Sequence, residues 1–471
     1  MRKIAACITV LALTAGGCSV AGARGDDTAE TVVVGYQSKT INTVTAGTLL
    51  RAQGYFEKRL AELGARTGRT YAVTWQDYDT GAPITAQMMA GKIDIGSMGD
   101  YPLLINGARG QQDAEARTHL ISITGYNARG GLNSIVVAPN SPVHTLADLK
   151  GRTVSASIGS AGHGLLVQAA RKAGLDPGKD FKTENQQPQV GATALESGSV
   201  AALSQFVAWP GLLVHQGRAR LLYDGGTLGV PTFHGVVVRE RYAAERSDVV
   251  EAFLRAQLDA TNFLHRSPLQ AAQVVADVTG LPAEVVYLYN GPGGVATFDP
   301  TVKPVLREAL ARDVPFLKEV GVLQQVDLAT FVDDTQLRAV YGANYDQDAG
   351  TTVNPAPISG NDPVCDRPVN DPALASELWP ADSDLTQPAA TPTCLLRAVR
   401  AAGTRSRAAY VPDTSTGTRW FADKSVWVRD PAAPEQERFK PFSTETAAQS
   451  YLDAHAGSHR LSYAEAVAGA A

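Results

Sequence analysis

Short apolar runs alternate with longer amphipathic segments between residues 30 and 345. The runs Thr31–Tyr36 and Tyr71–Trp75 are short and rich in β-branched and aromatic residues, which predicts buried strands. Between them, Ala46–Leu63 has the spacing of an amphipathic helix, interrupted at Gly54. Strands that alternate with helices predict a mostly parallel sheet covered on both faces, with ligands at the carboxyl ends of its strands.

Two predicted strands end in small residues directly before a helix. One is the segment Asp94–Gly107, in which we expect a glycine turn before a helix that opens at Pro102. The other is Ser155–Gly164, in which Ser160 is expected to cap the helix. A helix N-terminus leaves backbone N–H groups free, so each place suits an anion or a polar ligand.

The N-terminus predicts an exported lipoprotein. Basic residues precede the apolar run Ile4–Leu13, which is too short to span a bilayer. The segment Thr14–Ser19 resembles a bacterial lipobox, which implies cleavage before Cys18 and lipidation of its thiol. An ordinary cleaved signal with an incidental cysteine is the alternative. The predicted divisions are a signal peptide over 1–17 and a tether over 18–30, and no later segment is apolar enough to cross a membrane.

Composition narrows the function classes. The chain has 471 residues, enough for two or three domains, and its 42 basic against 47 acidic side chains leave no basic stripe for nucleic acid. After export, Cys365 and Cys394 are an even pair, which favours a disulfide, with a two-thiol copper site as the alternative. No cofactor and no metal site are predicted, and no nucleophile-elbow sequence is present.

Residues 31–345 resemble the substrate-binding proteins of nitrate/sulfonate/taurine-type ABC importers. The resemblance implies a periplasmic-binding-protein type II fold: two α/β lobes, about 31–126 with 230–345 and about 134–222, that close on a ligand. The matching segments are Gly35–Gln37, Trp75–Ala82, Gly91–Pro102, Ser141–Gly151, Gly159–His163 and Val207–Pro210.

The same resemblance implies which side chains contact the ligand. They are Gln37, Asp100 and Tyr101 from lobe one and Ser157, Ser160, His163 and Trp209 from lobe two, with Gln205 and Asp79 as weaker candidates. For Asp100, an alternative is that it only caps the helix, and His163 has packing as its alternative.

The implied function is capture of a small anionic or zwitterionic solute, sulfonate- or taurine-like, outside the cytoplasm. The partners would be an ABC permease with its ATPase, and the membrane through the N-terminal lipid. Asp100 is unfavourable beside an anion and is expected to meet an amine of the ligand. An enzyme is the alternative, because a thiamine-pyrimidine synthase has this fold, but its clustered-cysteine motif is absent here.

The composition changes after Tyr345. Residues 346–363 are rich in Gly, Asn, Pro, Thr and Asp, which predicts a linker, and 364–471 show a small α+β pattern. The part from Tyr410 to Ala466 resembles the nitrous-oxide-reductase accessory lipoprotein family, so a copper- or other metal-handling lipoprotein is a further alternative. The Cys/Met copper motif of that family is absent, and Gly457 is expected to end the helix between His455 and His459.

Overall fold

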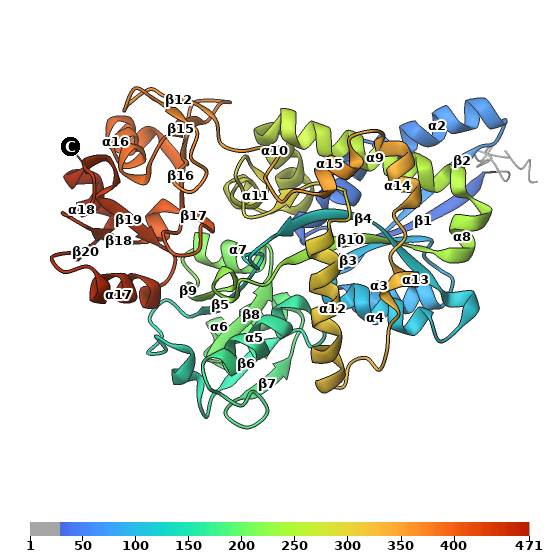
Figure 1. The fold of residues 1–471 in the computed structure, drawn as a ribbon, viewed down its shortest axis with the longest axis horizontal. Helices are drawn as coiled ribbons and strands as arrows, with labels where there is room; N and C mark the ends of the chain where they lie inside the picture. Colours follow the sequence, from blue (N-terminus) through green and yellow to red (C-terminus); the bar gives the residue numbers. More distant parts are fainter. Residues whose placement is uncertain (1–28, 471) are drawn as a thin grey trace, which may run out of the picture.

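The computed structural model describes residues 29–470, which form two α/β lobes and a C-terminal module (Figure 1). The predicted lipid site at Cys18 lies outside the described residues. Within residues 29–470, no helix combines the length and the apolar character that crossing a membrane requires.

Lobe one is built on a six-stranded mixed sheet. Its order is β11-β4-β10-β3-β1-β2, with β1 parallel to β2 and β3, and β10 antiparallel to both of its neighbours. Strand β10 lies far along the chain and still occupies the centre of this sheet. The strands are β1 Glu30–Tyr36, β2 Tyr71–Asp77, β3 Ile95–Gly99, β4 Thr118–Asn127, β10 Thr232–Arg239 and β11 Thr297–Phe298.

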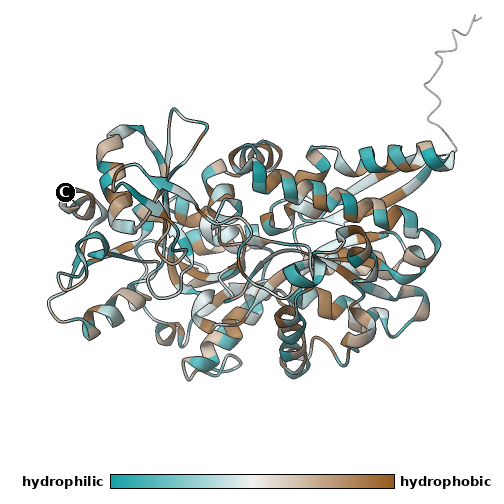
Figure 2. Cartoon of the chain, turned by 45° about the horizontal axis from the view of Figure 1, so that its top comes forward, coloured by the Kyte–Doolittle hydropathy of each residue, from teal (hydrophilic) through white to brown (hydrophobic). Residues whose placement is uncertain are grey.

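Helices cover both faces of this sheet, and Figure 2 shows hydrophilic and hydrophobic residues on opposite sides of several helices, as amphipathic patterns require. Phe253 of α9, for example, is fully buried and packs edge-on against Phe56 of α2. The helices are α1 Thr48–Ala52, α2 Tyr55–Thr67, α3 Gly81–Met89, α4 Asp100–Gly110, α8 Glu240–Glu245, α9 Ser247–Arg266, α10 Pro268–Thr279, α11 Ala283–Asn290, α12 Pro304–Glu319, α13 Leu328–Phe331, α14 Thr335–Tyr341 and α15 Tyr345–Ala349.

The expected glycine turn before α4 is a strand instead. Strand β3 runs as far as Gly99, and α4 begins at the next residue. The glycines serve close packing: a Cβ at Gly96 would lie 2.8 Å from Ile84 Cγ2, and one at Gly99 would lie 3.0 Å from His234 Nε2. This glycine run therefore lets α3 and β10 approach β3.

Lobe two has a five-stranded sheet of order β7-β6-β8-β5-β9, with β6 parallel to β7 and β8. Two crossing segments connect it to lobe one, one between β4 and β5 and one through residues 225–231. Its elements are β5 Asn133–Val137, β6 Thr153–Ala156, α5 Ala161–Lys172, β7 Lys182–Asn185, α6 Pro188–Glu196, β8 Ala202–Phe206, α7 Trp209–His215 and β9 Arg220–Asp224.

The C-terminal module forms one end of the molecule (Figure 1). It contains a β12-β13 hairpin, a β15-β14-β16-β17 sheet and a β19-β18-β20 sheet. The sulfurs of Cys365 and Cys394 are joined as a disulfide, with the Cα atoms 6.0 Å apart. The elements are β12 Gly360–Asp362, β13 Arg367–Val369, β14 Ser376–Pro380, β15 Gln387–Ala389, α16 Pro392–Ala402, β16 Ser406–Pro412, β17 Arg419–Phe421, β18 Val426–Arg429, β19 Phe439–Phe442, α17 Glu445–Ala454, β20 His459–Leu461 and α18 Tyr463–Gly469.

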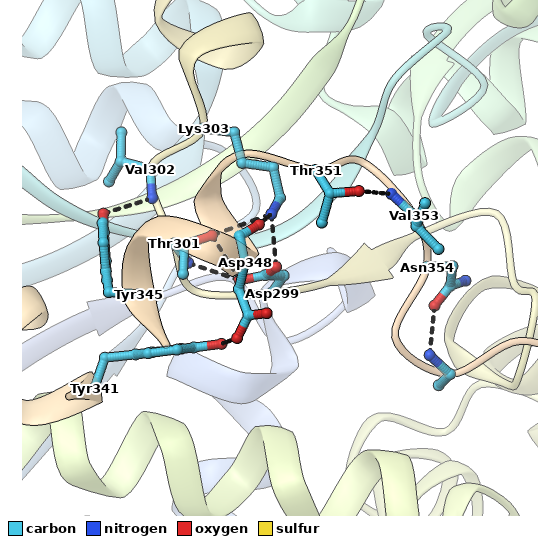
Figure 3. A network of polar contacts seen from close by, with 11 residues as sticks. Asp299, Thr301, Val302, Lys303, Tyr341, Tyr345, Asp348, Thr351, Val353 and Asn354 are labelled. Carbon is cyan, nitrogen blue, oxygen red and sulfur yellow. Dashed lines mark hydrogen bonds and ion pairs between the residues drawn. The ribbon is translucent and has the colours of Figure 1, made fainter. Parts of the chain in front are cut away.

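The first residues of the predicted linker belong structurally to lobe one. Figure 3 shows the polar network that holds them. The buried ammonium of Lys303 is 2.6 Å from Asp299 Oδ2 and donates to the carbonyl of Asp348 in α15 at 2.6 Å. Tyr345 is also buried, and its hydroxyl accepts from the N–H of Val302. Composition indicated a linker here because polar residues dominate, but those polar groups are satisfied within the lobe.

One hydrophobic cluster joins the three parts of the chain. It contains Leu203 and Leu213 of lobe two, Tyr289 of α11, and Trp420 and Phe421 of the module. Polar contacts reinforce it, because the Thr416 hydroxyl donates to Asp224 of lobe two at 2.6 Å and the Tyr410 hydroxyl donates to the carbonyl of Glu284 at 2.9 Å. The module therefore contacts both lobes beside their crossing segments.

Candidate functional site

A cavity of about 360 Å³ lies between the two lobes. Lobe one contributes the starts of α3 and α4 and part of β10, and lobe two contributes the starts of α5 and α6. The cavity is lined by Gln37, Thr80, Gly81, Ala82, Thr85, Gly99, Pro102, Ile105, Arg109, Ser157, Ile158, Gly159, Ser160, Ala161, Asn185, Gln187, Phe206, His234, Gly321 and Val322.

Four helix N-termini meet at this cavity. The residues just before α3, α4, α5 and α6 are Thr80, Gly99, Ser160 and Gln187, and all four line it. Each helix follows a strand of its own sheet, so the carboxyl ends of the two sheets face one another. Each N-terminus carries a partial positive charge of about half an elementary unit. The backbone alone therefore makes this cavity favourable for an anion.

Two polar side chains of lobe two have donors left for a ligand. The Ser160 hydroxyl accepts from the N–H of His163 at 3.3 Å, as the predicted cap requires, and its own O–H stays available. Asn185 accepts the N–H of Ile158 through Oδ1 at 3.0 Å, which leaves its NH₂ group without a partner among the described residues.

Ser157 is committed to the protein. Its hydroxyl donates to the carbonyl of Gln186 at 2.8 Å and accepts from Gln205 Nε2 at 3.1 Å. The hydroxyl proton is therefore already engaged. Ser157 lines the cavity, and Gln205 lies behind it, fully buried.

Arg109 is the one formally charged side chain among the lining residues. It lies on α4 with Pro102 and Ile105, and the spacing of three and four residues places all three on one face of the helix. None of the lining residues carries a carboxylate. The side chains of Ile158, Phe206 and Val322 extend the apolar part of the wall.

Asp100 does not line the cavity, contrary to the sequence-based expectation. Its carboxylate points toward β10, where it accepts from the Thr232 hydroxyl at 2.6 Å and from the N–H of Phe233 at 3.3 Å. It also accepts from the N–H of Tyr101, the next residue, but it does not cap α4, whose N-cap residue is Gly99. Burial raises the pKa of Asp100 to about 6 despite these hydrogen bonds.

Tyr101, His163 and Trp209 also lie outside the set of lining residues. The hydroxyl of Tyr101 accepts from Gln168 in α5. His163 is buried in the first turn of α5, and burial lowers its pKa. Trp209 starts α7 and packs against the hydrophobic cluster that joins the three parts of the chain. Phe206, at the end of β8, lines the cavity instead.

The structure therefore gathers three of the seven expected contacts in one cavity, namely Gln37, Ser157 and Ser160. It adds residues that the sequence analysis missed, chiefly Thr80, Arg109, Asn185 and His234. The weaker candidate Asp79 is exposed and does not line the cavity. Thr80 had a usable signal, because a threonine directly before α3 resembles the serine directly before α5.

Potential metal ligands cluster at one place in residues 29–470. Asp362, Cys365 and Cys394 have ligand atoms within 4.8 Å of one another, but the two sulfurs are bonded together. Asp362 is also occupied, since it accepts the N–H groups of Cys365 and Ala390. His455 and His459 do not share a helix, because α17 ends at Ala454 and His459 is in β20.

Comparisons with known proteins bear on the fold and on the class of protein. Residues 82–271 match the family model described as NMT1/THI5 like. A putative aliphatic sulfonates-binding protein of Escherichia coli (strain K12) is 29% identical over 322 residues, which are 65% of this chain and 92% of the relative. A taurine-binding periplasmic protein of the same organism is 26% identical over 191 residues, 40% of this chain and 56% of its own length.

Among solved structures, the alkanesulfonate-binding protein of Xanthomonas axonopodis pv. citri, bound to MOPS, is 26% identical with a TM-score of 0.53. The match covers 64% of this chain and 98% of that one. These similarities confirm the predicted two-lobe periplasmic-binding-protein fold with additional C-terminal elements. The relatives are binding proteins for sulfonates and taurine. The family of the C-terminal module stays a prediction.

Proposed function

We propose that this chain binds an aliphatic sulfonate between its lobes and delivers it to the permease of an ABC importer. The observation that carries the proposal is the cavity itself, which is lined by four helix N-termini and by Arg109 and by no carboxylate. A sulfonate is fully ionised and only accepts hydrogen bonds, so it matches a site made of donors. The sulfonate-binding relatives support the same ligand class.

The head group would lie where the starts of α3 and α5 face each other. Ser160 and Asn185 would donate from their side chains, and Ser157 would hold this wall in place through its bonds to Gln186 and Gln205. Arg109 would add Coulombic attraction. A hydrogen bond to a charged group contributes about 1.5 to 3 kcal/mol, so two or three of them supply about 3 to 9 kcal/mol of binding free energy.

The apolar part of the cavity wall favours a ligand with an alkyl chain attached to its head group. Ile105, Ile158 and Phe206 offer hydrocarbon surface to a short alkyl chain. Gln37 gives its amide N–H to the carbonyl of Ser97 at 3.2 Å, so its oxygen remains as an acceptor for a ligand amine. That acceptor is neutral, and Asp100 is turned away. Alkanesulfonates should therefore bind at least as tightly as taurine, whose ammonium group finds no carboxylate in the cavity.

The proposed location is outside the cytoplasm, with the protein attached to the membrane through a lipid on Cys18. Export matches the relatives, one of which is named a periplasmic protein. Cys18→Ser should release the protein from the membrane fraction of expressing cells, without a change in ligand affinity. A wild-type N-terminal peptide with no lipid mass would contradict the anchor and leave the binding proposal intact.

Calorimetric titration of the purified chain tests the binding proposal. We expect propanesulfonate and butanesulfonate to bind, and butylammonium and butanol not to bind. Arg109→Gln should weaken sulfonate binding about tenfold and reduce its dependence on salt, because screening acts on charge. Arg69→Gln is the matched control, since it makes the same charge change beside the amino end of β2, away from the cavity. If Arg109→Gln and Arg69→Gln bound sulfonate equally well, Arg109 would not be part of the site. If the wild-type protein bound no sulfonate, the proposed function would be overturned.

A further inference from the structure

The side chain of His234 enters the cavity from the middle of the lobe one sheet. It lies on β10 opposite Gly99 of β3, and only 4% of the residue is exposed. A Cβ at position 99 would lie 3.0 Å from Nε2 and 3.2 Å from Cε1 of the imidazole. Glycine at this position therefore gives the Nε2 edge of the ring its place among the lining residues.

The other ring nitrogen is already used. Asn42 Nδ2 lies 2.6 Å from His234 Nδ1 and 3.1 Å from the carbonyl oxygen of Gly125. A carbonyl oxygen only accepts, so the amide group facing it must be the NH₂ of Asn42. Its second N–H then points at Nδ1, which has to accept and carries no proton. The neutral ring consequently has its proton on Nε2.

The imidazole also stays neutral. Burial lowers the pKa of His234 to about 3. Of the charged groups on the neighbouring α4, Asp100 is bonded to Thr232 and Phe233 of β10, and Arg109 lies on the cavity wall. A second ring proton would also have to sit against the N–H of Asn42. His234 is therefore a fixed, uncharged donor.

We infer that His234 donates its Nε2–H to an oxygen of the bound sulfonate and is a ligand contact in its own right. The inference rests on the proposed function and deepens it, because the anion would be held partly by a neutral donor of defined tautomer. Asn42 is then a positioning residue, which fixes that tautomer without touching the ligand. The two parts of the head-group site should differ in response to salt: Arg109 acts through charge, and His234 acts through a directional hydrogen bond.

Two substitutions separate a ligand contact from a structural role. His234→Gln retains a donor near the position of Nε2 but loses the acceptor for Asn42. His234→Asn retains an acceptor near the position of Nδ1 but has no donor that reaches the cavity. A ligand contact predicts that the Gln variant binds better than the Asn variant. A role in packing predicts that affinity follows thermal stability, which should favour the Asn variant.

The experiment is calorimetric titration of wild type and both variants with propanesulfonate, at low and at moderate salt, alongside thermal unfolding. We expect His234→Asn to bind about 10- to 100-fold more weakly, with an unchanged salt dependence, and His234→Gln to stay within about threefold of wild type. Nitrogen-15 NMR of the imidazole should show the proton on Nε2, with a shift when propanesulfonate is added.

The outcomes distinguish this inference from the function on which it rests. If wild type does not bind propanesulfonate, the proposed function fails. If wild type binds and both variants bind equally well, the function stands and the contact by His234 is overturned. Affinity losses that follow the unfolding temperatures, or an imidazole proton on Nδ1, would likewise overturn the contact.

Discussion

The hydroxyl of Tyr101 in lobe one accepts a hydrogen bond from the side-chain amide of Gln168 in lobe two, over 2.7 Å. The tyrosine ring lies against α5, at the point where Gly164 has no side chain. The same hydroxyl is 3.4 Å from Asp313 Oδ1 of α12. Tyr101 was expected to touch the ligand, and it instead joins the lobes beside the cavity.

This contact predicts the effect of a single methyl group. In Gly164→Ala, the new Cβ would lie 2.3 Å from Tyr101 Cζ, which is far inside van der Waals contact. Overpacking costs about 1 to 3 kcal/mol, so we expect sulfonate affinity to fall about tenfold as the lobes are held apart. Calorimetry would measure this.

Tyr101→Phe is the comparison, since it keeps the ring and loses the hydrogen bonds from Gln168 and to Asp313, each worth about 1 kcal/mol. Unchanged affinity in Gly164→Ala would mean that this lobe contact is not part of the liganded state.

The buried carboxyl groups beside Tyr101 predict a pH dependence of stability. Burial, followed by the charge of Asp100, raises the pKa of Asp313 to about 8. In the unfolded chain this carboxyl group loses its proton at about pH 4. Between about pH 4 and 8 the folded state therefore binds more protons than the unfolded state does. The free energy of unfolding must then fall as the pH rises through this window.

Asp313→Asn should remove that loss, since the amide resembles the protonated acid. We expect the variant to gain stability over wild type at pH 8, and to gain less at pH 5. Guanidinium unfolding at the two pH values checks this, with the exposed Asp384→Asn as control. If the variant exceeded wild type in free energy of unfolding by the same amount at both pH values, the expected pH dependence would be contradicted.

A buried ion pair predicts how firmly the module is attached. Arg419 and Glu377 pair at 2.6 Å with side chains only 4% exposed. Glu377 also accepts from the Tyr287 hydroxyl of lobe one at 3.0 Å. Glu377→Gln would leave the Arg419 charge buried without its partner, which costs about 3 to 5 kcal/mol. Urea unfolding should show this loss.

Glu435→Gln supplies the contrast, because Glu435 is 70% exposed in its pair with Arg397 and such pairs contribute about 0 to 1 kcal/mol. If the two variants lost similar amounts of stability, burial would not explain the difference expected between the two ion pairs.

The pair Cys365–Cys394 predicts a response to reductant. A disulfide across a sequence separation of 29 residues stabilises by about 3 to 4 kcal/mol in the chain-entropy model. Protein purified without reductant should give the linked peptides by mass spectrometry, and Cys365→Ser with Cys394→Ser should lower the unfolding midpoint. Two free thiols in exported protein would rule out the bond.

The sequence predicted those features of the fold that depend on local pattern. The strand Thr31–Tyr36 lies within β1, and Ser160 caps α5 as expected. Both follow from neighbouring residues, since hydrophobic runs make buried strands and a serine before a helix accepts its free N–H groups. The two-lobe fold was predicted from the resemblance to importer binding proteins, whose motifs occur here in the same order.

The site was harder to predict, because long-range pairing decides it. Asp100 stands at the end of a strand, but its partners Thr232 and Phe233 come from β10, more than a hundred residues later. Local sequence cannot show that β10 enters the sheet beside β3 and draws the carboxylate away. His234 was missed for the same reason, because only the register of β10 places it opposite Gly99.

The hydrophobic cluster shared by lobe two, α11 and the module bears on how the chain folds and how it can be divided. Trp420 and Phe421 are each 2% exposed, and they are packed with residues that precede them by some two hundred positions. A chain cut before the module would expose that surface to water, so the two lobes without the module should aggregate. Heating the intact chain should give one cooperative transition in which the module and the lobes unfold together. The C-terminal module, residues 364–471 and so about a quarter of the sequence, would in this sense complete the hydrophobic core on which the fold of the lobes depends.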